Sequence, residues 1–282
     1  MNQRKKALTI NDQISLLRQR GCIINDYDKC KIVLENVSYY RLSAYFLPFK
    51  LQNGDYAKGT SIDKIFSIYE FDRELRTLFL SAVEIIEISI RAKIANYYAL
   101  KYDPYSYIVP DNFNNNHNPK NFKANLERAI RQNENSQFVK HYNKNYNGEF
   151  PIWVAVELFT MGMLSRFYSD LTTKDKKELM GKQYSGATSW LRCCTDLRNI
   201  CAHYGRLYYR KFPAIPKGFK LDKSNERALW ASLLCIRELY PSAEQWNEVF
   251  VKNLQRIIKK YEATIELTHI GFPDNWTVTL IK

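Results

Sequence analysis

The sequence predicts an all-α protein. Residues 61–101 contain neither Gly nor Pro, and their apolar side chains recur at intervals of three and four, the periodicity of one long helix or of two helices end to end. Helix-start signals recur along the rest of the chain, whereas the alternation of apolar and polar residues that marks a half-buried strand is nearly absent. We therefore expect residues 1–282 to fold as a single helical domain with a sizeable core.

The N-terminal part of the chain, residues 1–50, is predicted to hold three helices. Thr9 and Asp12 form a capping-box pattern at the start of a first amphipathic helix. A second helix is expected over residues 26–36. The aromatic-rich stretch 37–49 is expected to form a core helix that ends before its proline.

The core of the fold is expected between residues 60 and 210. An irregular loop over 103–119 should separate the long helix from a basic helix, 119–132, in which Pro occupies the first position after an Asn cap. A strongly apolar stretch, 151–168, predicts a buried helix that bends near its glycine. The run 187–208 predicts a further helix.

The C-terminal part, residues 222–282, is predicted to add two amphipathic helices, 224–240 and 241–261. The last stretch, from residue 269 onward, is expected to be an irregular docked tail with a short strand at most.

The charge of the chain favours an anionic partner. Lys and Arg number 42 against 29 Asp and Glu, which gives a net charge of +13 and a pI near 9.3. Nucleic acid is the first candidate. No apolar run reaches the roughly 18 residues that a membrane span needs, and the basic N-terminus lacks the apolar segment of a signal peptide. We expect a cytoplasmic protein that does not bind a membrane.

Cysteine and histidine usage predicts no metal site and no cofactor. The six cysteines form no CxxC pair and are expected to be buried, reduced thiols: Cys22, Cys30, Cys193, Cys194, Cys201 and Cys235. The four histidines are scattered and lack the spacing of zinc ligands. His117, in the irregular loop, is expected to be solvated.

The chemistry is expected on the helix predicted over residues 187–208. Five polar residues share one narrow sector of its helical wheel: Arg192, Asp196, Asn199, His203 and Arg206. The opposite sector is apolar: Trp190, Cys193, Cys194, Leu197, Ile200 and Cys201. Two further cations follow at the C-terminal end: Arg210 and Lys211. In this chain only this row places a His among Arg, Asp and Asn at helical spacing.

Such a row suits cleavage of RNA without a metal. That reaction needs a base for the ribose 2′-OH proton, an acid for the leaving 5′-oxygen and a cation for the phosphoryl charge. His203 can be base or acid and Arg198 the planar cation, while Asn199, one turn before His203, can orient the imidazole or bind phosphate. One His cannot easily act as both base and acid in one step. We therefore expect a homodimer in which two copies face each other across a two-fold axis.

Arg198 is geometrically the weakest member of this set. It lies about 140° around the helix from His203, so only the length of its side chain can bring the guanidinium over the polar row. Two other interpretations remain open: a non-catalytic RNA-binding or RNA-regulated module that uses the same basic face, and a structural network between helices. The net charge disfavours the second.

Two groups of charges also have two interpretations each. The charges of the long helix, among them Glu84, Glu87 and Arg91, either form a solvated, salt-bridged face or turn one or two members toward the helix of Arg198. Arg41 either belongs to a packed aromatic helix or points outward to a phosphate.

The stretch Arg198-Asn-Ile-Cys-Ala-His203 matches the RX4-6H motif of HEPN ribonucleases. Further stretches resemble, in the same order, the Abi-D/F (Abi_2) family of bacterial abortive-infection proteins: residues 8–17, 37–49, 69–76, 203–210 and 271–276. The resemblance covers nearly the whole chain.

The resemblance implies a HEPN-like helical bundle over residues 60–210, with N-terminal and C-terminal helical extensions. It implies an antiphage toxin whose target is RNA, with Arg198 and His203 as the catalytic pair and Asn199 as their polar neighbour. The products would be a 2′,3′-cyclic phosphate and a 5′-OH, and the toxin would be held in check by a partner such as a small regulatory RNA. HEPN toxins controlled by nucleotidylation carry a Tyr two residues after the His. Here Gly205 occupies that position and Tyr204 is adjacent, which puts that control in doubt.

Overall fold

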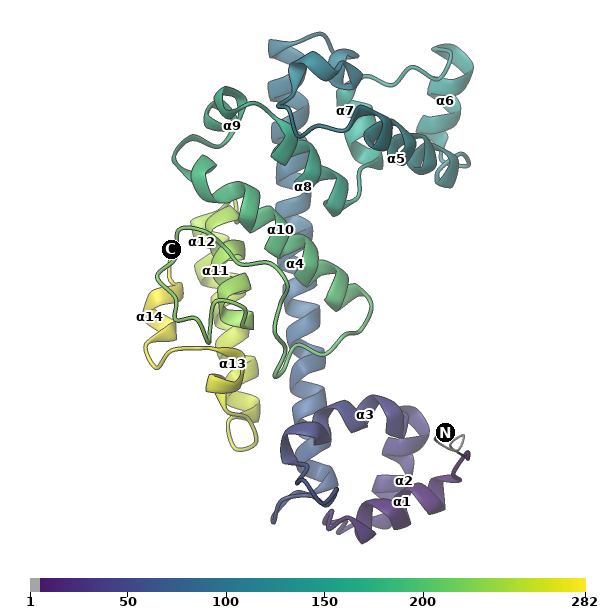
Figure 1. The fold of residues 1–282 in the computed structure, drawn as a ribbon, viewed down its shortest axis with the longest axis vertical. Helices are drawn as coiled ribbons and strands as arrows, with labels where there is room; N and C mark the ends of the chain where they lie inside the picture. Colours follow the sequence, from purple (N-terminus) through teal and green to yellow (C-terminus); the bar gives the residue numbers. More distant parts are fainter. Residues whose placement is uncertain (1–5) are drawn as a thin grey trace.

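The protein is built from helices, as predicted. The computed structural model describes residues 6–282, and among these residues no strand is formed (Figure 1). Extended pairing is limited in this part of the chain to isolated bridges such as that between Lys50 and Tyr56. Residues 1–5, which belong to the stretch expected to lack a signal peptide, lie outside the described residues.

Helix α4 (Ile62–Lys101) is the spine of the molecule. Its 40 residues extend over about 60 Å, and Figure 1 shows the other helices arranged along it. The Ser61 side chain caps its N-terminus by accepting a hydrogen bond from the Lys64 amide at 3.1 Å. Of the two alternatives predicted for residues 61–101, one long helix or two helices end to end, the structure has the first.

Three short helices form a lobe at the N-terminal end of α4: α1 (Ile10–Gln19), α2 (Tyr27–Asn36) and α3 (Tyr39–Phe46). The predicted capping box is present, because the Asp12 amide donates to Thr9 Oγ1 and the Thr9 amide donates to Asp12 Oδ2, each at 3.2 Å. A 3-10 turn over Leu47–Phe49 carries the proline and ends α3 as expected.

A second lobe forms at the other end of α4. It holds α5 (Pro119–Gln132), α6 (Gln137–Asn145), α7 (Ile152–Ala155), α8 (Met161–Asp170) and α9 (Thr173–Met180). The side chain of Asn118 caps α5 through the Asn121 amide at 2.9 Å, as the Asn-Pro signal predicts.

The apolar stretch 151–168 is two helices and not the single bent helix that we predicted. A 3-10 turn follows α7, the chain then becomes extended at Phe159, and Thr160 caps the new helix α8. The break is stabilised from α4, since Arg91 donates hydrogen bonds to the carbonyls of Val156 at 3.2 Å and Phe159 at 2.8 Å. A cation distant in the sequence therefore satisfies the carbonyl groups that the break frees.

The remaining helices belong to the middle of the molecule. They are α10 (Tyr184–Ala202), α11 (Leu229–Leu239), α12 (Ala243–Gln245), α13 (Lys252–Tyr261) and α14 (Trp276–Leu280). Of these, α10, α11 and α13 pack against α4. A π-helical segment joins α12 to α13. The tail, expected to form a short strand at most, instead ends in α14, because Trp276 and Leu280, four residues apart, are both buried.

Helix α10 ends six residues earlier than predicted, at Ala202 and not at Tyr208. His203 is its C-cap, and Tyr204 adopts a left-handed conformation with φ of 57°. The amides of Tyr204 and Gly205 turn back onto the carbonyls of Cys201 and Ile200, at 3.0 and 2.7 Å. These two hydrogen bonds form a Schellman motif, which closes the helix.

A buried carboxylate on α4 holds the segment that follows this motif. Asp72 accepts hydrogen bonds from the amides of Leu207 at 3.0 Å and Tyr208 at 2.8 Å, from Arg76 at 2.6 Å and from the Tyr45 hydroxyl at 2.7 Å. Burial raises the pKa of Asp72, and its four donors oppose that shift by stabilising the ionised form. Asp72 thus links α3, α4 and the segment after α10.

The thiol prediction is confirmed, since all six cysteines are free and buried. The prediction for His117 is wrong. Its side chain is only 3% exposed, its ring stacks on Phe113 at 4.1 Å, and its Nδ1 lies 3.0 Å from a carboxylate oxygen of Asp170 on α8. The loop before α5 therefore packs against α8.

Replacing Asp72 by Ala is expected to lower the free energy of unfolding by about 3–5 kcal/mol, because it leaves the buried Arg76 without its counter-ion and two amides without an acceptor. Urea unfolding measures the change. The control Glu70→Ala breaks the partly exposed pair of Glu70 and Arg73 and should cost less than about 1 kcal/mol. Equal losses in the two variants would contradict this account of Asp72.

Candidate functional site

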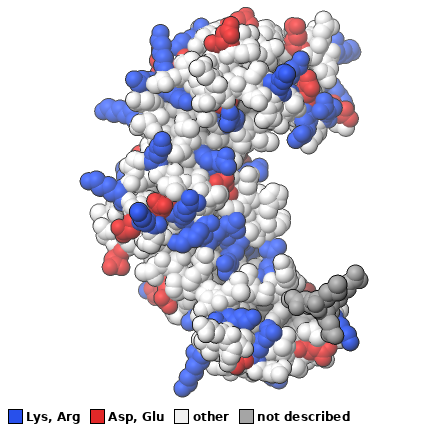
Figure 2. Space-filling view, in the orientation of Figure 1, with Lys and Arg blue, Asp and Glu red and all other residues white. Residues whose placement is uncertain are grey.

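The C-terminal half of α10 lies in the hollow between the two lobes. Figure 1 shows this end of the helix between the lobe of α1–α3 and that of α5–α7, and Figure 2 shows the molecule hollowed on that side. Lys and Arg side chains gather over the middle of the face that Figure 2 shows. The opposite side of α10 is buried, as predicted, through residues such as Cys193, Leu197 and Cys201.

Three predicted site residues lie exposed on α10 or at its cap: Arg192, Asn199 and His203. Asp196 is mostly buried and pairs with Arg192, whose Nε lies 3.4 Å from a carboxylate oxygen of Asp196. The other oxygen of Asp196 has no hydrogen-bond partner among the described residues. The row therefore carries one partly compensated cation, one amide and one imidazole at helical spacing.

Arg198 lies elsewhere on the helix surface. It lines a pocket of about 400 Å³ together with Glu84 and Glu87 of α4, and Glu87 is paired with Arg91 at 2.6 Å. Glu84 and Glu87 therefore line the same pocket as Arg198, but among the described residues neither forms an ion pair with it, and Glu87 keeps its salt bridge within α4. His203 does not line this pocket.

Arg206 is not a member of the polar row. It follows the end of α10, is partly buried, and donates a hydrogen bond to the Ala44 carbonyl of α3. Burial lowers the pKa of its guanidinium. Its predicted place in the helical row is wrong, because α10 ends at Ala202, before residue 206.

The two cations beyond Arg206 are both exposed. Lys211 donates to the Ser224 carbonyl, whereas Arg210 follows the left-handed residue Tyr209. Neither continues the helical row.

Two arginines that sequence reasoning did not assign to the site hold the residues beside His203. Arg41 Nη1 donates to the Tyr204 carbonyl at 2.8 Å, and Arg76 Nη1 lies 3.4 Å from the Gly205 carbonyl. Arg41 thus binds a backbone group of the candidate site. No sequence signal relates it to Tyr204, because 163 residues separate the two.

Tyr204 is the other residue that the sequence did not place. Its side chain is 68% exposed next to His203, and its backbone occupies the left-handed position at which Gly is usual. The next residue is Gly205, and the structure leaves no room for a side chain at this position. A Cβ there would lie 2.9 Å from Ile200 Cγ2 and 3.1 Å from the Ile200 carbonyl oxygen. The absence of Tyr at position 205 thus has a steric reason.

Comparison with known families adds a second kind of evidence. Residues 32–209 match the family model described as Abi-like protein. The chain belongs to the Abi-like protein family. The match runs from α2 to the segment after α10 and includes Asn199 and His203, and membership in the Abi-like family points to a role in abortive infection. No curated protein and no solved structure matches this Abi-like chain.

Among residues 6–282 of this Abi-like protein, no helix combines the length and the apolar character that crossing a bilayer requires. The 40-residue helix α4 is long enough, but it carries charged side chains in both of its halves.

Replacing Tyr204 by Gly should raise the free energy of unfolding by about 1 kcal/mol, because Gly adopts the left-handed conformation without the steric cost of a Cβ. Thermal unfolding measures the shift. The control is Tyr40→Gly, which removes a ring that is 87% exposed but lies within α3, and it should lower stability by about 0.5 kcal/mol. A loss of stability in Tyr204→Gly would show that the ring makes contacts that outweigh the strain.

Proposed function

We propose that this Abi-like protein is a metal-independent endoribonuclease with a HEPN-type site, acting in bacterial abortive-infection defence. The observation that carries the proposal is His203, exposed at the end of α10 on the hollowed side of a chain with a net charge of +13. Asn199 is exposed one turn before it, and Arg198 completes the RX4H spacing.

The reaction is an attack of the ribose 2′-OH on the adjacent phosphate. A base takes the hydroxyl proton, the new O–P bond closes a 2′,3′-cyclic phosphate, and an acid protonates the leaving 5′-oxygen, which becomes the 5′-OH of the second fragment. An imidazole can accept or donate a proton at neutral pH. His203 takes these roles, Arg198 stabilises the charge on the phosphoryl oxygens, and Asn199 orients the imidazole or binds phosphate.

A homodimer completes this site. In one chain Arg198 lies about 140° around α10 from His203 and lines a pocket that His203 does not line. Two copies that pack the ends of α10 across a two-fold axis place one His203 as base and the other as acid. They also offer two copies of Arg198 to the same phosphate.

A small regulatory RNA is the expected inhibitor of this toxin. The same basic side of α10 would bind both the inhibitor and the substrate, so the two would compete. The placement of Arg198 beside acidic residues favours a second candidate function, in which the α10 face only binds RNA and does not cleave it.

Cleavage of labelled single-stranded RNA in EDTA tests the first function. His203→Ala should lower the rate at least about 100-fold, because general acid–base catalysis contributes that much. His141→Ala is the matched control, since His141 is also exposed but lies on α6. A substrate with 2′-deoxyribose at the cut site should resist cleavage. Cleavage that survives His203→Ala, or that requires Mg²⁺, would refute the mechanism.

The dimer is tested by its dependence on concentration. Sedimentation velocity should show a dimer, and the specific activity should fall on dilution in parallel with the dimer fraction. Full activity at a concentration at which the chain is monomeric would contradict the shared site.

A further inference from the structure

A basic pocket lies near the first half of α10, at the end of its polar face that is remote from His203. We propose that this pocket, between α8, α10 and the segment around Lys217, binds a phosphate of the RNA strand several nucleotides from the cut. The inference rests on the proposed function only in taking RNA as the ligand. The pocket has a volume of about 490 Å³, and Arg192 at its edge is roughly 16 Å along the helix from His203.

The chemistry of the pocket fits a phosphate group. Three cations line it: Arg166, Arg192 and Lys217. The rest of its lining consists of Gly162 and the side chains of Ser and Thr, among them Thr188 and Ser189. Among the described residues no carboxylate lines this pocket. Guanidinium, ammonium and hydroxyl groups are the side chains that bind phosphate oxygens in proteins.

Lys217 is held in place by α10 itself. Its backbone amide donates to Ser189 Oγ at 2.9 Å, and its carbonyl accepts a hydrogen bond from Trp190 Nε1 at 2.8 Å. Lys217 itself is exposed, and it makes no ion pair among the described residues. The loop after α10 thus returns to the first half of this helix and places a cation at the rim of the pocket.

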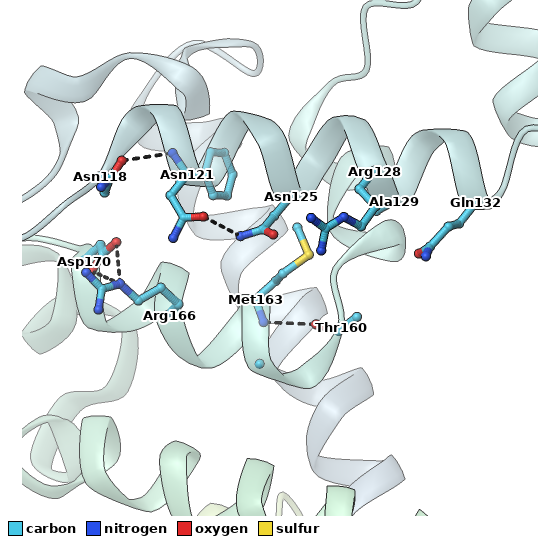
Figure 3. A pocket seen from close by; sticks show the side chains of 12 residues that line it. Asn118, Asn121, Asn125, Arg128, Ala129, Gln132, Thr160, Met163, Arg166 and Asp170 are labelled. Carbon is cyan, nitrogen blue, oxygen red and sulfur yellow. Dashed lines mark hydrogen bonds and ion pairs between the residues drawn. The ribbon is translucent and has the colours of Figure 1, made fainter.

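Arg166 also lines a neighbouring pocket between α5 and α8. Its Nε lies 3.0 Å from an oxygen of Asp170, its Nη2 donates to the Asn116 carbonyl at 2.7 Å, and its side chain remains 60% exposed. This neighbouring pocket has a volume of about 430 Å³ and shares Arg166 and Gly162 with the basic pocket. Figure 3 shows the side chains of Asn121, Asn125 and Arg128 along α5, facing Met163 and Arg166 of α8.

The position of the pocket favours an RNA strand over a free anion. Thr188, Arg192, Asn199 and His203 follow one another at intervals of four, seven and four residues, which places them on one face of α10. A strand whose cleaved phosphate lies at His203 meets Arg192 as it runs along this face. Beyond it the strand reaches Lys217 and Arg166, and then the amides of α5, which can hydrogen-bond with unpaired bases.

Fluorescence anisotropy tests this assignment with a chain that cannot cleave. In a His203→Ala background, the double variant Arg192→Ala/Lys217→Ala should bind a 12-nucleotide single-stranded RNA about tenfold more weakly than its parent. The slope of log Kd against log salt should fall by about 0.7 for each phosphate that the variant no longer neutralises.

The matched control is Lys31→Ala/Lys58→Ala, which removes the same charge from exposed positions in the N-terminal part of the chain. Arg192→Lys/Lys217→Arg should restore the affinity. If both double-alanine variants bind the 12-nucleotide RNA alike, the pocket is not a phosphate subsite, although RNA remains the ligand of the protein.

Two other results would also overturn the inference. If the parent binds no RNA, the proposed function fails and the subsite fails with it. Calorimetry with adenosine 5′-monophosphate and with inorganic phosphate tests the remaining source of a phosphate group. Binding that Arg192→Ala/Lys217→Ala abolishes, together with an unchanged RNA affinity, would assign the pocket to a free nucleotide or phosphate and not to the strand.

Discussion

The buried carboxylate of Asp72 is the interaction on which the candidate site depends. Its oxygens accept hydrogen bonds from two backbone amides after α10, from Arg76, which like Asp72 belongs to α4, and from Tyr45 of α3. Because this segment must reach α4, α10 cannot continue past Ala202, and the chain reverses through the left-handed Tyr204. His203 is consequently a cap residue, exposed at a helix end, and not one more position inside a helix.

Two groups of cations near the candidate site and along α10 have different partners. Arg41, Arg76, Arg91 and Arg206 donate to backbone carbonyls, at helix ends and at breaks where the helical hydrogen-bond pattern stops. They stabilise the fold around the site. Arg192 and Lys217 remain exposed along the α10 face. The capacity for an anionic ligand thus lies in the second group, and net charge alone does not separate the two.

The same geometry explains why the proposed chemistry involves two chains. The five-residue separation that defines the RX4H spacing turns Arg198 away from His203, and in this fold Arg198 lines a pocket with Glu84 and Glu87 of α4. A helix end in a hollow between two lobes leaves His203 accessible to a second copy and to a strand. The hollow, the end of α10 and the basic pocket at Lys217 form one surface on which the proposals rest.

The sequence by itself determined the features that depend on neighbours within one or two turns. The Thr9 capping box, the Asn-Pro start of α5, the apolar side of α10 and the helical character of residues 61–101 were all predictable, because caps and periodicity are local. The end of α10, the break before α8 and the burial of His117 were not. Each depends on a contact between residues far apart in the chain, such as the 135 residues between Asp72 and Leu207, and only tertiary packing brings such groups together.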